Sequence, residues 1–97
     1  MRLEYHPSTI SDLNRAIEFY EGQRPGLGAA CRVEVYAAIE RVQQSPKRHR
    51  IIGEDIHRCF VHRFPFSILY RVIDDEVIRI LVIRHHRQRP SYGRLRK

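Results

Sequence analysis

Apolar and polar positions alternate in the second half of the chain, which predicts β-strands there. Three runs predict strands: Ile56–Phe64, which has β-formers at alternate places, Ser67–Ile73 and Val77–Arg84. Successive side chains of a strand point to opposite faces, so alternation indicates a strand with one covered face. Pro65 separates the first two runs, and Asp74-Asp75 is a hairpin turn between the other two. The last run is so rich in Val and Ile that it should be central and covered on both faces.

The first half of the chain has the spacing of helices instead. Apolar residues recur every three or four positions, which is the stripe of an amphipathic helix ending near Gly22. The stripe consists of Ile10, Leu13, Ala16, Ile17 and Tyr20. Ser8, Thr9 and Ser11 are candidate N-caps. A second helix is predicted from about residue 29 to residue 44, after a turn rich in Pro and Gly, so the two helices should form a helical hairpin.

A short run at Arg2–His6 adds a strand before the helices, and Ile51-Ile52 is either a short strand or a loop. The predicted order is therefore β-α-α-β-β-β. This is an α+β fold in which a helical hairpin packs on one face of a small, mostly antiparallel sheet. We expect residues 1–97 to form one domain with a basic tail at about 87–97.

Strand alternation also assigns the two faces of the predicted sheet. The face toward the helices should carry Ile68, Tyr70, Val72, Ile78, Ile80 and Val82. The outer face should carry Leu69, Arg71, Arg79, Leu81, Ile83 and His85. Since the outer face mixes Leu and Ile with Arg, either the tail or a partner should cover it.

The charge is unevenly distributed along the chain and indicates an acidic partner. The net charge is +7. Residues 1–46 hold five Arg and six acids, which gives −1, whereas residues 47–97 hold thirteen Lys or Arg and five acids, which gives +8. Asymmetry of this kind is typical of proteins that bind a polyanion, either a nucleic acid or an acidic protein segment. A solvated basic face is the alternative.

The composition excludes two broad classes of protein. Apolar residues make up 42% of the chain and charged residues 30%, so it is neither a disordered nor a membrane chain. No apolar run approaches the ~20 residues of a membrane span. The first ten residues, MRLEYHPSTI, lack the apolar core of a secretory signal. We therefore expect a cytoplasmic protein that does not interact with membranes.

Motifs for metals and cofactors are missing from the sequence. There is no Gly-rich phosphate loop, zinc-ligand spacing or Ser-His-Asp pattern, so we predict no cofactor and no metal site. His57 and His62 are five positions apart and should point to opposite faces of a strand. Cys31 and Cys59 are far apart, and we expect both to be small, buried, free side chains.

The remaining candidates are basic and aromatic side chains around the end of the last strand. Binding of a target or a nucleic acid would involve Arg63, Arg84, His85, His86 and Arg89, with Arg71, Arg87 and Tyr92 beside them. A guanidinium presents a planar fork of donors that suits phosphate, His can move a proton near neutral pH, and Tyr can stack on a base. Such parts could cleave RNA, or they could dock acidic residues of a partner. The residues alone leave both open.

Three segments carry a family pattern: HPSTISDLNRAIEFYEGQRPGLG, the helix end VQQSP, and RFPFSILYRVIDDEVIRILVIRHHRQRPSY. With these segments the chain, over nearly all its length, resembles the RelE/ParE superfamily of bacterial type II toxin–antitoxin toxins, and within it the ParE-like plasmid stabilization branch. The resemblance implies the β-α-α-β-β-β fold and a basic, growth-inhibiting toxin that forms a hetero-oligomer with a cognate antitoxin. Exposed Leu69, Leu81 and Ile83, together with the helical hairpin, would bind an extended segment of the antitoxin.

The superfamily divides by target. RelE-like toxins cut messenger RNA on the ribosome with basic strand residues and a C-terminal Tyr, and the resemblance would assign this catalysis to Arg71, Arg87 and Tyr92. ParE-like toxins lack most of that set and inhibit DNA gyrase. Ser67 stands where RelE-like toxins place an Arg, so the sequence favours a gyrase inhibitor without enzymatic activity. A ribosome-dependent mRNA endoribonuclease and a non-toxic nucleic-acid-binding module are the alternatives.

Overall fold

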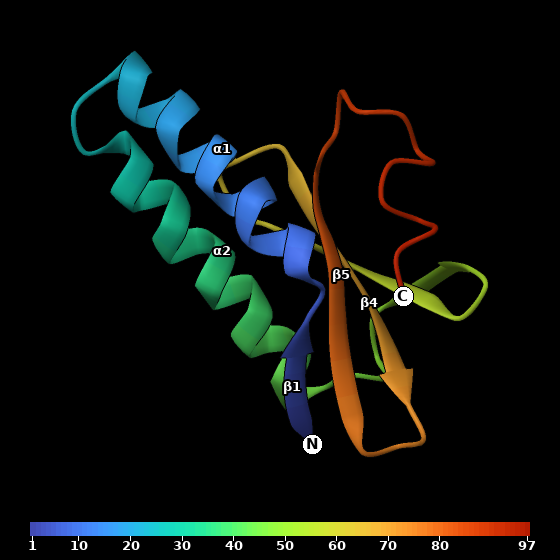
Figure 1. Ribbon diagram of the computed structural model, residues 1–97. Coiled ribbons are helices and arrows are strands. Elements are labelled where there is room, and N and C mark those ends of the chain that lie inside the picture. Colours follow the sequence, from blue (N-terminus) through green and yellow to red (C-terminus); the bar gives the residue numbers. More distant parts are fainter.

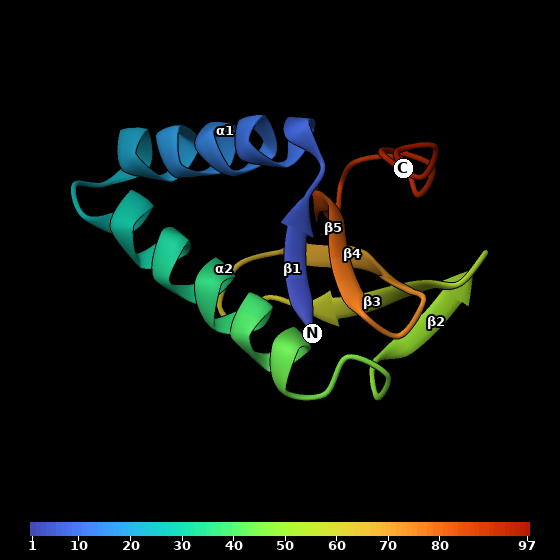
Figure 2. The same cartoon turned by 60° about the horizontal axis from the view of Figure 1, so that its bottom comes forward.

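Two helices lie on one face of a five-stranded mixed sheet in the computed structural model, which describes residues 1–97 (Figure 1). The elements are β1 (Arg2–Tyr5), α1 (Pro7–Gln23), α2 (Leu27–Gln44), β2 (Arg50–Gly53), β3 (Ile56–Phe60), β4 (Phe66–Ile73) and β5 (Val77–His85). The strands are ordered β1-β5-β4-β3-β2; β1 runs parallel to β5, and the other neighbours are antiparallel. Figure 2 shows the helical hairpin on one side of β5 and the C-terminal tail on the other.

The predicted α+β fold is confirmed, and Ile51-Ile52 lie in a strand rather than a loop. The β2–β3 turn, Glu54-Asp55, has positive φ angles of 54° and 61°. The β4–β5 turn includes Asp74-Asp75, as expected, with φ angles of 52° and 59°. Two consecutive positive φ angles give a turn the twist that matches its flanking strands. β3 ends at Phe60, earlier than predicted, because the chain turns through Arg63, where φ is 69°.

The prediction that Ser8, Thr9 or Ser11 caps the first helix is wrong. His6 is the N-cap residue, and its Nδ1 accepts a hydrogen bond from the amide of Ser8 at 3.0 Å. Pro7 occupies the first helical position, where its missing N–H has no partner to lose and its fixed φ suits a helix. Pro7 therefore begins α1 as well as ending β1.

The predicted stripe of α1 is confirmed at Leu13, Ala16 and Tyr20, which lie in or against the core, and is wrong at Ile10. Thr9, Asp12 and Ala16 are buried, whereas Ile10, expected in the core, is 61% exposed. The buried positions are three and four residues apart, as one helix face requires, but two of them are polar, so hydrophobicity alone did not mark that face. Buried polar side chains need hydrogen-bond partners, and both find them on β5.

The edge of β5 is free beyond the end of β1, and α1 covers it. The last residue of β1 pairs with Ile80. Beyond that point, the Thr9 hydroxyl donates to the carbonyl of Leu81 at 3.2 Å, and Asp12 accepts from the amide of Ile83 at 3.1 Å. The two helix side chains thus take over hydrogen bonds that a longer β1 would make.

A β-bulge on β5 changes which residues face the helices. Leu69 pairs with Val82, whereas the next residue of β4 pairs with Ile80, so Leu81 is an extra residue on β5. Because side chains alternate with a period of two, one extra residue exchanges the faces beyond it. Val82 therefore lies on the outer face and Ile83 faces the helices, the reverse of the prediction.

The prediction that Leu69, Leu81 and Ile83 are exposed for an antitoxin is also wrong. Their exposed fractions are 0%, 0% and 2%. The bulge turns Ile83 into the main core beneath the helices. Leu69 and Leu81 belong to a second apolar cluster on the outer face, and Tyr92 of the tail packs on it. The tail, rather than a partner, covers this face.

Candidate functional site at the end of the sheet

A buried carboxylate on α1 holds the C-terminal tail. The side chain of Asp12 is 1% exposed. Arg96 donates to it from both terminal nitrogens, at 2.6 and 3.3 Å, and Arg15 donates at 3.0 Å. The Tyr92 hydroxyl donates to the same carboxylate at 3.2 Å. With the amide of Ile83, these donors compensate for the loss of water around a buried charge.

Tyr92 is part of this anchor, and its hydroxyl is fully engaged. Besides donating to Asp12, the oxygen accepts from Arg15 at 2.7 Å and from Arg96 at 3.3 Å. The Arg96 guanidinium lies over the Tyr92 ring, 5.2 Å from its centroid. The hydrogen bond to Asp12 raises the pKa of Arg96 despite its burial. Tyr92 therefore acts here as a structural attachment of the tail.

β5 ends in a turn organised by His85. Its amide donates to the Gln88 side chain at 2.8 Å, and its Nδ1 accepts from the amide of Arg87 at 2.9 Å. Its ring packs edge-on against Phe66, with 5.0 Å between the centroids. Burial, assisted by the charges of Arg87 and His86, lowers the pKa of His85. The imidazole is therefore neutral at neutral pH, and its Nδ1 lone pair is committed to the turn.

Ser67 is buried and contacts His86. Ser67 is 1% exposed, and its Oγ lies 3.0 Å from Nε2 of His86. The amide of His86 donates to the carbonyl of Pro65 at 2.8 Å, and its ring meets the edge of Phe60 at 5.6 Å. The position where RelE-like toxins place an Arg thus provides no cation.

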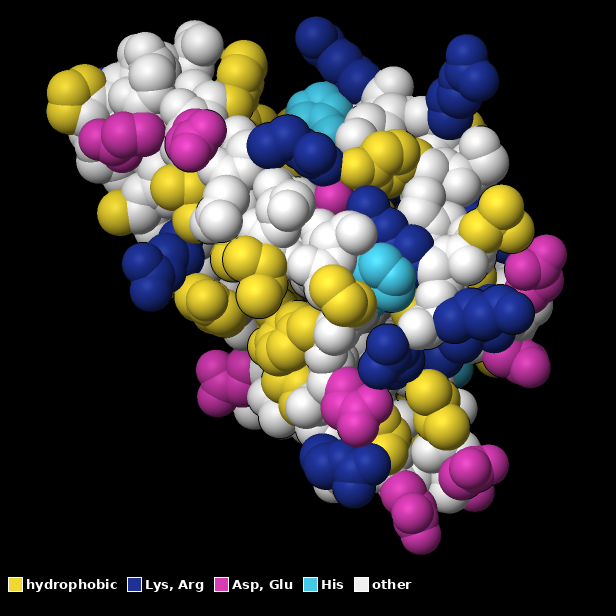
Figure 3. Space-filling model, in the orientation of Figure 1, with side chains coloured by type: hydrophobic (Ala, Val, Ile, Leu, Met, Phe, Trp, Pro, Cys, Tyr) yellow, Lys and Arg dark blue, Asp and Glu magenta, His cyan; other side chains and the backbone are white.

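Three arginines without a carboxylate partner, Arg58, Arg84 and Arg94, lie near one another around the outer face of the sheet. Arg84 donates to the carbonyl of Pro90 at 2.6 Å. Burial, together with the charges of Arg94 and Arg58, lowers the pKa of Arg84. None of the three forms an ion pair, so the group suits an anionic partner. Figure 3 shows Lys and Arg side chains mainly over the tail and strands, and apolar ones mainly over the helices and β1.

The other two arginines predicted to bind a target lie in a loop and in the tail. Arg63 lies in the β3–β4 loop with its guanidinium 5.4 Å from the centroid of the Phe64 ring. Arg89 is exposed on the tail, and its carbonyl accepts from the amide of Tyr92 at 2.8 Å. Both are exposed and available to a partner, and Arg89 directly precedes Pro90, whose carbonyl accepts from Arg84.

The three residues predicted to be catalytic are not brought together. Arg71 lies on β4 five positions from the residue that pairs with His85. At about 3.4 Å per residue, this places Arg71 about 17 Å from the strand end that leads to Arg87. The guanidinium of Arg71 donates instead to the carbonyl of Glu54 in the β2–β3 turn. Since the Tyr92 hydroxyl is held by the tail anchor, the three side chains do not share a site.

Sequence reasoning missed the residues that attach the tail, namely Asp12, Arg15 and Arg96. One signal was present: Thr9, Asp12 and Ala16 share a helix face. A carboxylate on a face that also carries a buried Ala needs a cation, and the acid-free tail is rich in them. The pairing across the fold could not be read from spacing.

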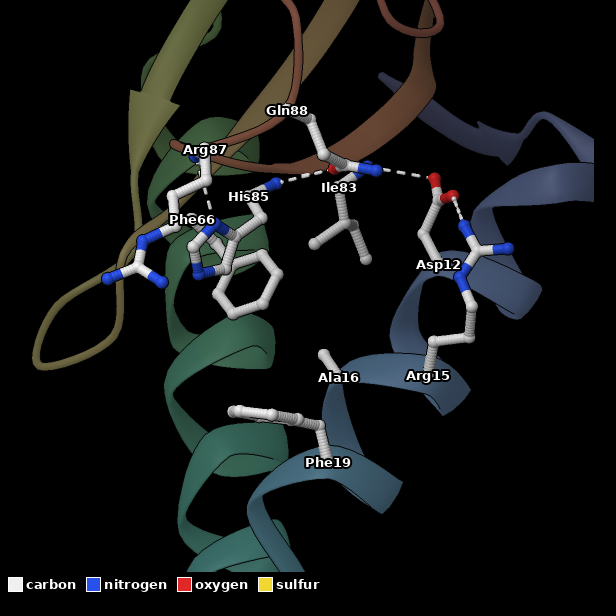
Figure 4. A pocket seen from close by; sticks show the side chains of 9 residues that line it. All are labelled: Asp12, Arg15, Ala16, Phe19, Phe66, Ile83, His85, Arg87 and Gln88. Carbon is white, nitrogen blue, oxygen red and sulfur yellow. Dashed lines mark hydrogen bonds and ion pairs between the residues drawn. The ribbon is translucent and has the colours of Figure 1, made fainter.

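A cavity of about 380 Å³ opens between α1 and the end of β5 (Figure 4). It is lined by Asp12, Arg15, Ala16, Phe19, Phe66, Ile83, His85, Arg87 and Gln88. No three His, Cys, Asp or Glu side chains of the chain gather as a metal ion would require. Neither helix combines the length and apolar character of a membrane span.

A family model described as the ParE toxin of the type II toxin–antitoxin system parDE matches residues 3–90. The chain belongs to the ParE toxin family. It is thus a toxin of the type II toxin–antitoxin class, and the family pairs such a toxin with a cognate antitoxin. A comparison with curated protein sequences finds no match.

Two solved structures share the fold of this ParE-family toxin. One is a chain of the chromosomal ParDE toxin–antitoxin system from P. aeruginosa, with a TM-score of 0.78 and 20% sequence identity over 88% of this chain and 95% of that chain. The other is the isolated E. coli RelE toxin, with a TM-score of 0.65 and 15% identity over 96% of this chain and 92% of that chain. These likenesses agree with the ParE and RelE resemblance in fold.

Proposed function

We propose that this ParE-family toxin inhibits growth by binding DNA gyrase, without catalysis of its own, and that a cognate antitoxin neutralises it in a cytoplasmic hetero-oligomer. The observation that carries this proposal is the separation of Arg71, Arg87 and Tyr92. RNA cleavage needs groups that act on one phosphate within hydrogen-bond reach of each other. Here Arg71 is bound to the β2–β3 turn, and Arg87 lies at the opposite end of the sheet. The hydroxyl of Tyr92 is held by Asp12.

Ser67 supports the same choice. A cation at this position could stabilise the charge that develops on a phosphate during cleavage. A buried hydroxyl that already contacts His86 supplies no such charge. The arginine group of Arg58, Arg84 and Arg94 then serves recognition rather than chemistry.

The antitoxin would cover an apolar groove between β1 and the two helices. A cavity of about 190 Å³ there is lined mainly by apolar side chains, among them Leu13 and Ile39. Three of its lining residues are large and exposed: Tyr5 at 40%, Ile10 at 61% and Tyr36 at 47%. Apolar surface of this kind suits a partner that stays bound. This groove replaces the outer-face leucines as the proposed antitoxin contact.

Two assays test the proposed target. Purified toxin is added to cell-free translation of a preformed messenger RNA, which removes any dependence on gyrase, and the RNA is sized afterwards. In parallel, DNA supercoiling by purified gyrase is measured with and without the toxin. We expect intact message, normal translation and inhibited supercoiling, with full activity of gyrase restored by the antitoxin.

The opposite results identify the alternatives. Discrete cleavage of the message with unaffected supercoiling would make the protein a ribosome-dependent mRNA endoribonuclease, and Arg71→Ala, Arg87→Ala or Tyr92→Ala should then reduce cleavage. The free protein could instead bind nucleic acid tightly, with an affinity that falls steeply with salt, and leave growth unaffected when expressed. That result would make it a nucleic-acid-binding module.

A further inference from the structure

The cavity between α1 and β5 has an apolar interior. Figure 4 shows Phe19 and Phe66 facing each other, with Ala16 at one side of the space between them and Ile83 beyond the Phe66 ring. Phe66, Ala16 and Ile83 are buried core residues, whereas Phe19 is 58% exposed although it is aromatic. A volume of about 380 Å³ accommodates one large side chain of a partner with room around it.

The Asp12 carboxylate, the side-chain oxygen of Gln88 and the Nδ1 of His85, all in the cavity lining, are already paired within the protein. The Asp12 carboxylate is bound by Arg15, Arg96, Tyr92 and the amide of Ile83. The Gln88 side chain accepts from the amide of His85, and the His85 Nδ1 accepts from the turn that follows it. The apolar interior formed by Ala16, Phe19, Phe66 and Ile83 therefore suits a side chain that needs no hydrogen bond.

The rim of the cavity is positively charged. Arg87 is exposed and forms no ion pair, and Arg15 keeps 61% of its side chain exposed while it contacts Asp12. A second hollow of about 400 Å³ shares Phe19, His85 and Arg87 with the cavity, so the surface continues past the rim. Residues 84–97 contain six Lys or Arg and no acid. Charge complementarity at the rim thus calls for carboxylates.

We propose that this cavity is a docking pocket for a short acidic protein segment that inserts one aromatic or branched apolar side chain. The insert would lie between Phe19 and Phe66, and its flanking carboxylates would meet Arg87 and Arg15. A nucleobase fits less well, because base recognition uses free hydrogen-bonding groups and open aromatic faces. Here the Asp12 carboxylate and the His85 Nδ1 are already bonded within the protein, and the Phe66 ring is met by His85 at 87° between the ring planes.

This inference rests on the proposal that the toxin acts by docking, but its test does not require gyrase. The probes are acetylated, amidated pentapeptides with a central Phe flanked by two acidic residues on each side. One matched peptide has Ala in place of Phe, and another has Gln in place of the acids. A thymidine pentanucleotide represents nucleic acid. Binding is followed by the NMR signals of the Ala16 and Ile83 methyl groups in the whole protein.

We expect the acidic Phe peptide to shift both methyl signals and to bind at least about tenfold more tightly than the Ala peptide. Arg87→Glu should weaken it by about fivefold or more, whereas Arg24→Glu, the same charge change at the exposed tip of the helical hairpin, should leave it unchanged. Phe19→Ala should weaken it without unfolding the protein, because Phe19 is largely exposed.

Equal binding of the Phe and Ala peptides, or shifts confined to other methyl groups, would overturn the inference that this cavity receives an apolar side chain. Binding of the pentanucleotide at the same methyl groups with equal or greater affinity would overturn the choice of a protein partner. Inhibited gyrase with no peptide binding would leave the proposed function intact and remove this inference. Peptide binding with unaffected gyrase would support the pocket, contradict gyrase as the target, and point to another acidic protein as the partner.

Discussion

The guanidinium of Arg96 donates to the carboxylate of Asp12 at 2.6 Å, although 84 positions separate them in the sequence. This contact closes the chain on itself, since Asp12 lies near the start of α1 and Arg96 is the penultimate residue. Both side chains are largely withdrawn from water, at 1% and 15% exposed. Their pairing therefore fixes the tail over the outer face of the sheet.

Asp12→Ala should destabilise the protein by about 3 kcal/mol, because it leaves a partly buried cation and a buried amide without partners. The measurement is the free energy of unfolding in urea. Arg2→Ala is the matched control: it removes the exposed Arg2–Glu4 pair, with side chains 69% and 38% exposed, and should cost less than about 0.5 kcal/mol. Equal losses of unfolding free energy in the two variants would show that the contacts of Asp12 with the tail stabilise the protein no more than an exposed ion pair does.

Gly93→Ala should loosen the tail and destabilise the protein by about 1–3 kcal/mol. Gly93 has a φ of +76°, and an added Cβ would lie 2.7 Å from the Cβ of Val82. The tail would have to lift from the outer apolar cluster, which hydrogen exchange of its amides would detect. Gly22→Ala has free space around the new methyl group and should leave stability unchanged or raise it by up to about 1 kcal/mol. Unchanged exchange in the Gly93 variant would contradict the close packing.

Much of the fold was predictable because hydrophobic periodicity reports local structure. The helical hairpin, the three main strands and the turn at Asp74-Asp75 followed from it. The faces of β5 were not predictable beyond Leu81, because a bulge leaves no mark in the hydrophobic pattern of a strand that is apolar on both faces. The edge pairing of β1 with β5 depends on the crossover by the helices, which single strands do not reveal.

His6 should make the stability depend on pH. Burial first, and then the charges of Arg96 and Arg79, lowers the pKa of His6 in the folded protein. The unfolded chain therefore binds more protons below about pH 6.5, so stability is complete above that value and falls as the pH drops through the folded pKa. The cause is visible in the structure, because an imidazolium cannot accept the hydrogen bond from Ser8.

Urea unfolding of two variants above and below about pH 6.5 separates this contribution from that of His85, whose pKa is also lowered by burial. His6→Asn keeps a capping oxygen that does not titrate, so it should lose part of the pH dependence. His6→Ala should cost about 1 kcal/mol at neutral pH and differ little from the parent in acid. Parallel pH curves for the parent and His6→Asn would refute the role of this cap.

Cys31 and Cys59 should be unreactive in the folded protein. Both are free and buried, as the sequence predicted, with exposed fractions of 0% and 4%. Burial raises the pKa of both thiols, which lowers the fraction of reactive thiolate. An aromatic disulfide reagent should therefore label them only as fast as the protein opens, and both should react at once in denaturant. Rapid labelling of either thiol without denaturant would contradict this.

The candidate site was predictable in composition but not in geometry. The basic tail and the residues after β5 could be singled out from charge alone. Whether Arg71, Arg87 and Tyr92 meet depends on strand length and on how the tail is fastened, and neither is encoded in local spacing. Asp12 was overlooked because a carboxylate on a helix is usually solvated, and only the distant Arg96 explains its burial.

The extra residue at Leu81 determines which side chains at the end of β5 face the helices and which face the tail. Deleting Leu81 would remove the bulge and leave both faces as they are, with Val82 and Arg84 on the outer face and Ile83 beneath the helices. Pairing Leu81 in plain alternation, with every residue kept, would instead turn the end of the strand over, so that Ile83 would point toward the tail and Arg84 into the helical layer. An alignment that places no gap at Leu81 will therefore compare opposite surfaces of this strand when a relative lacks the extra residue.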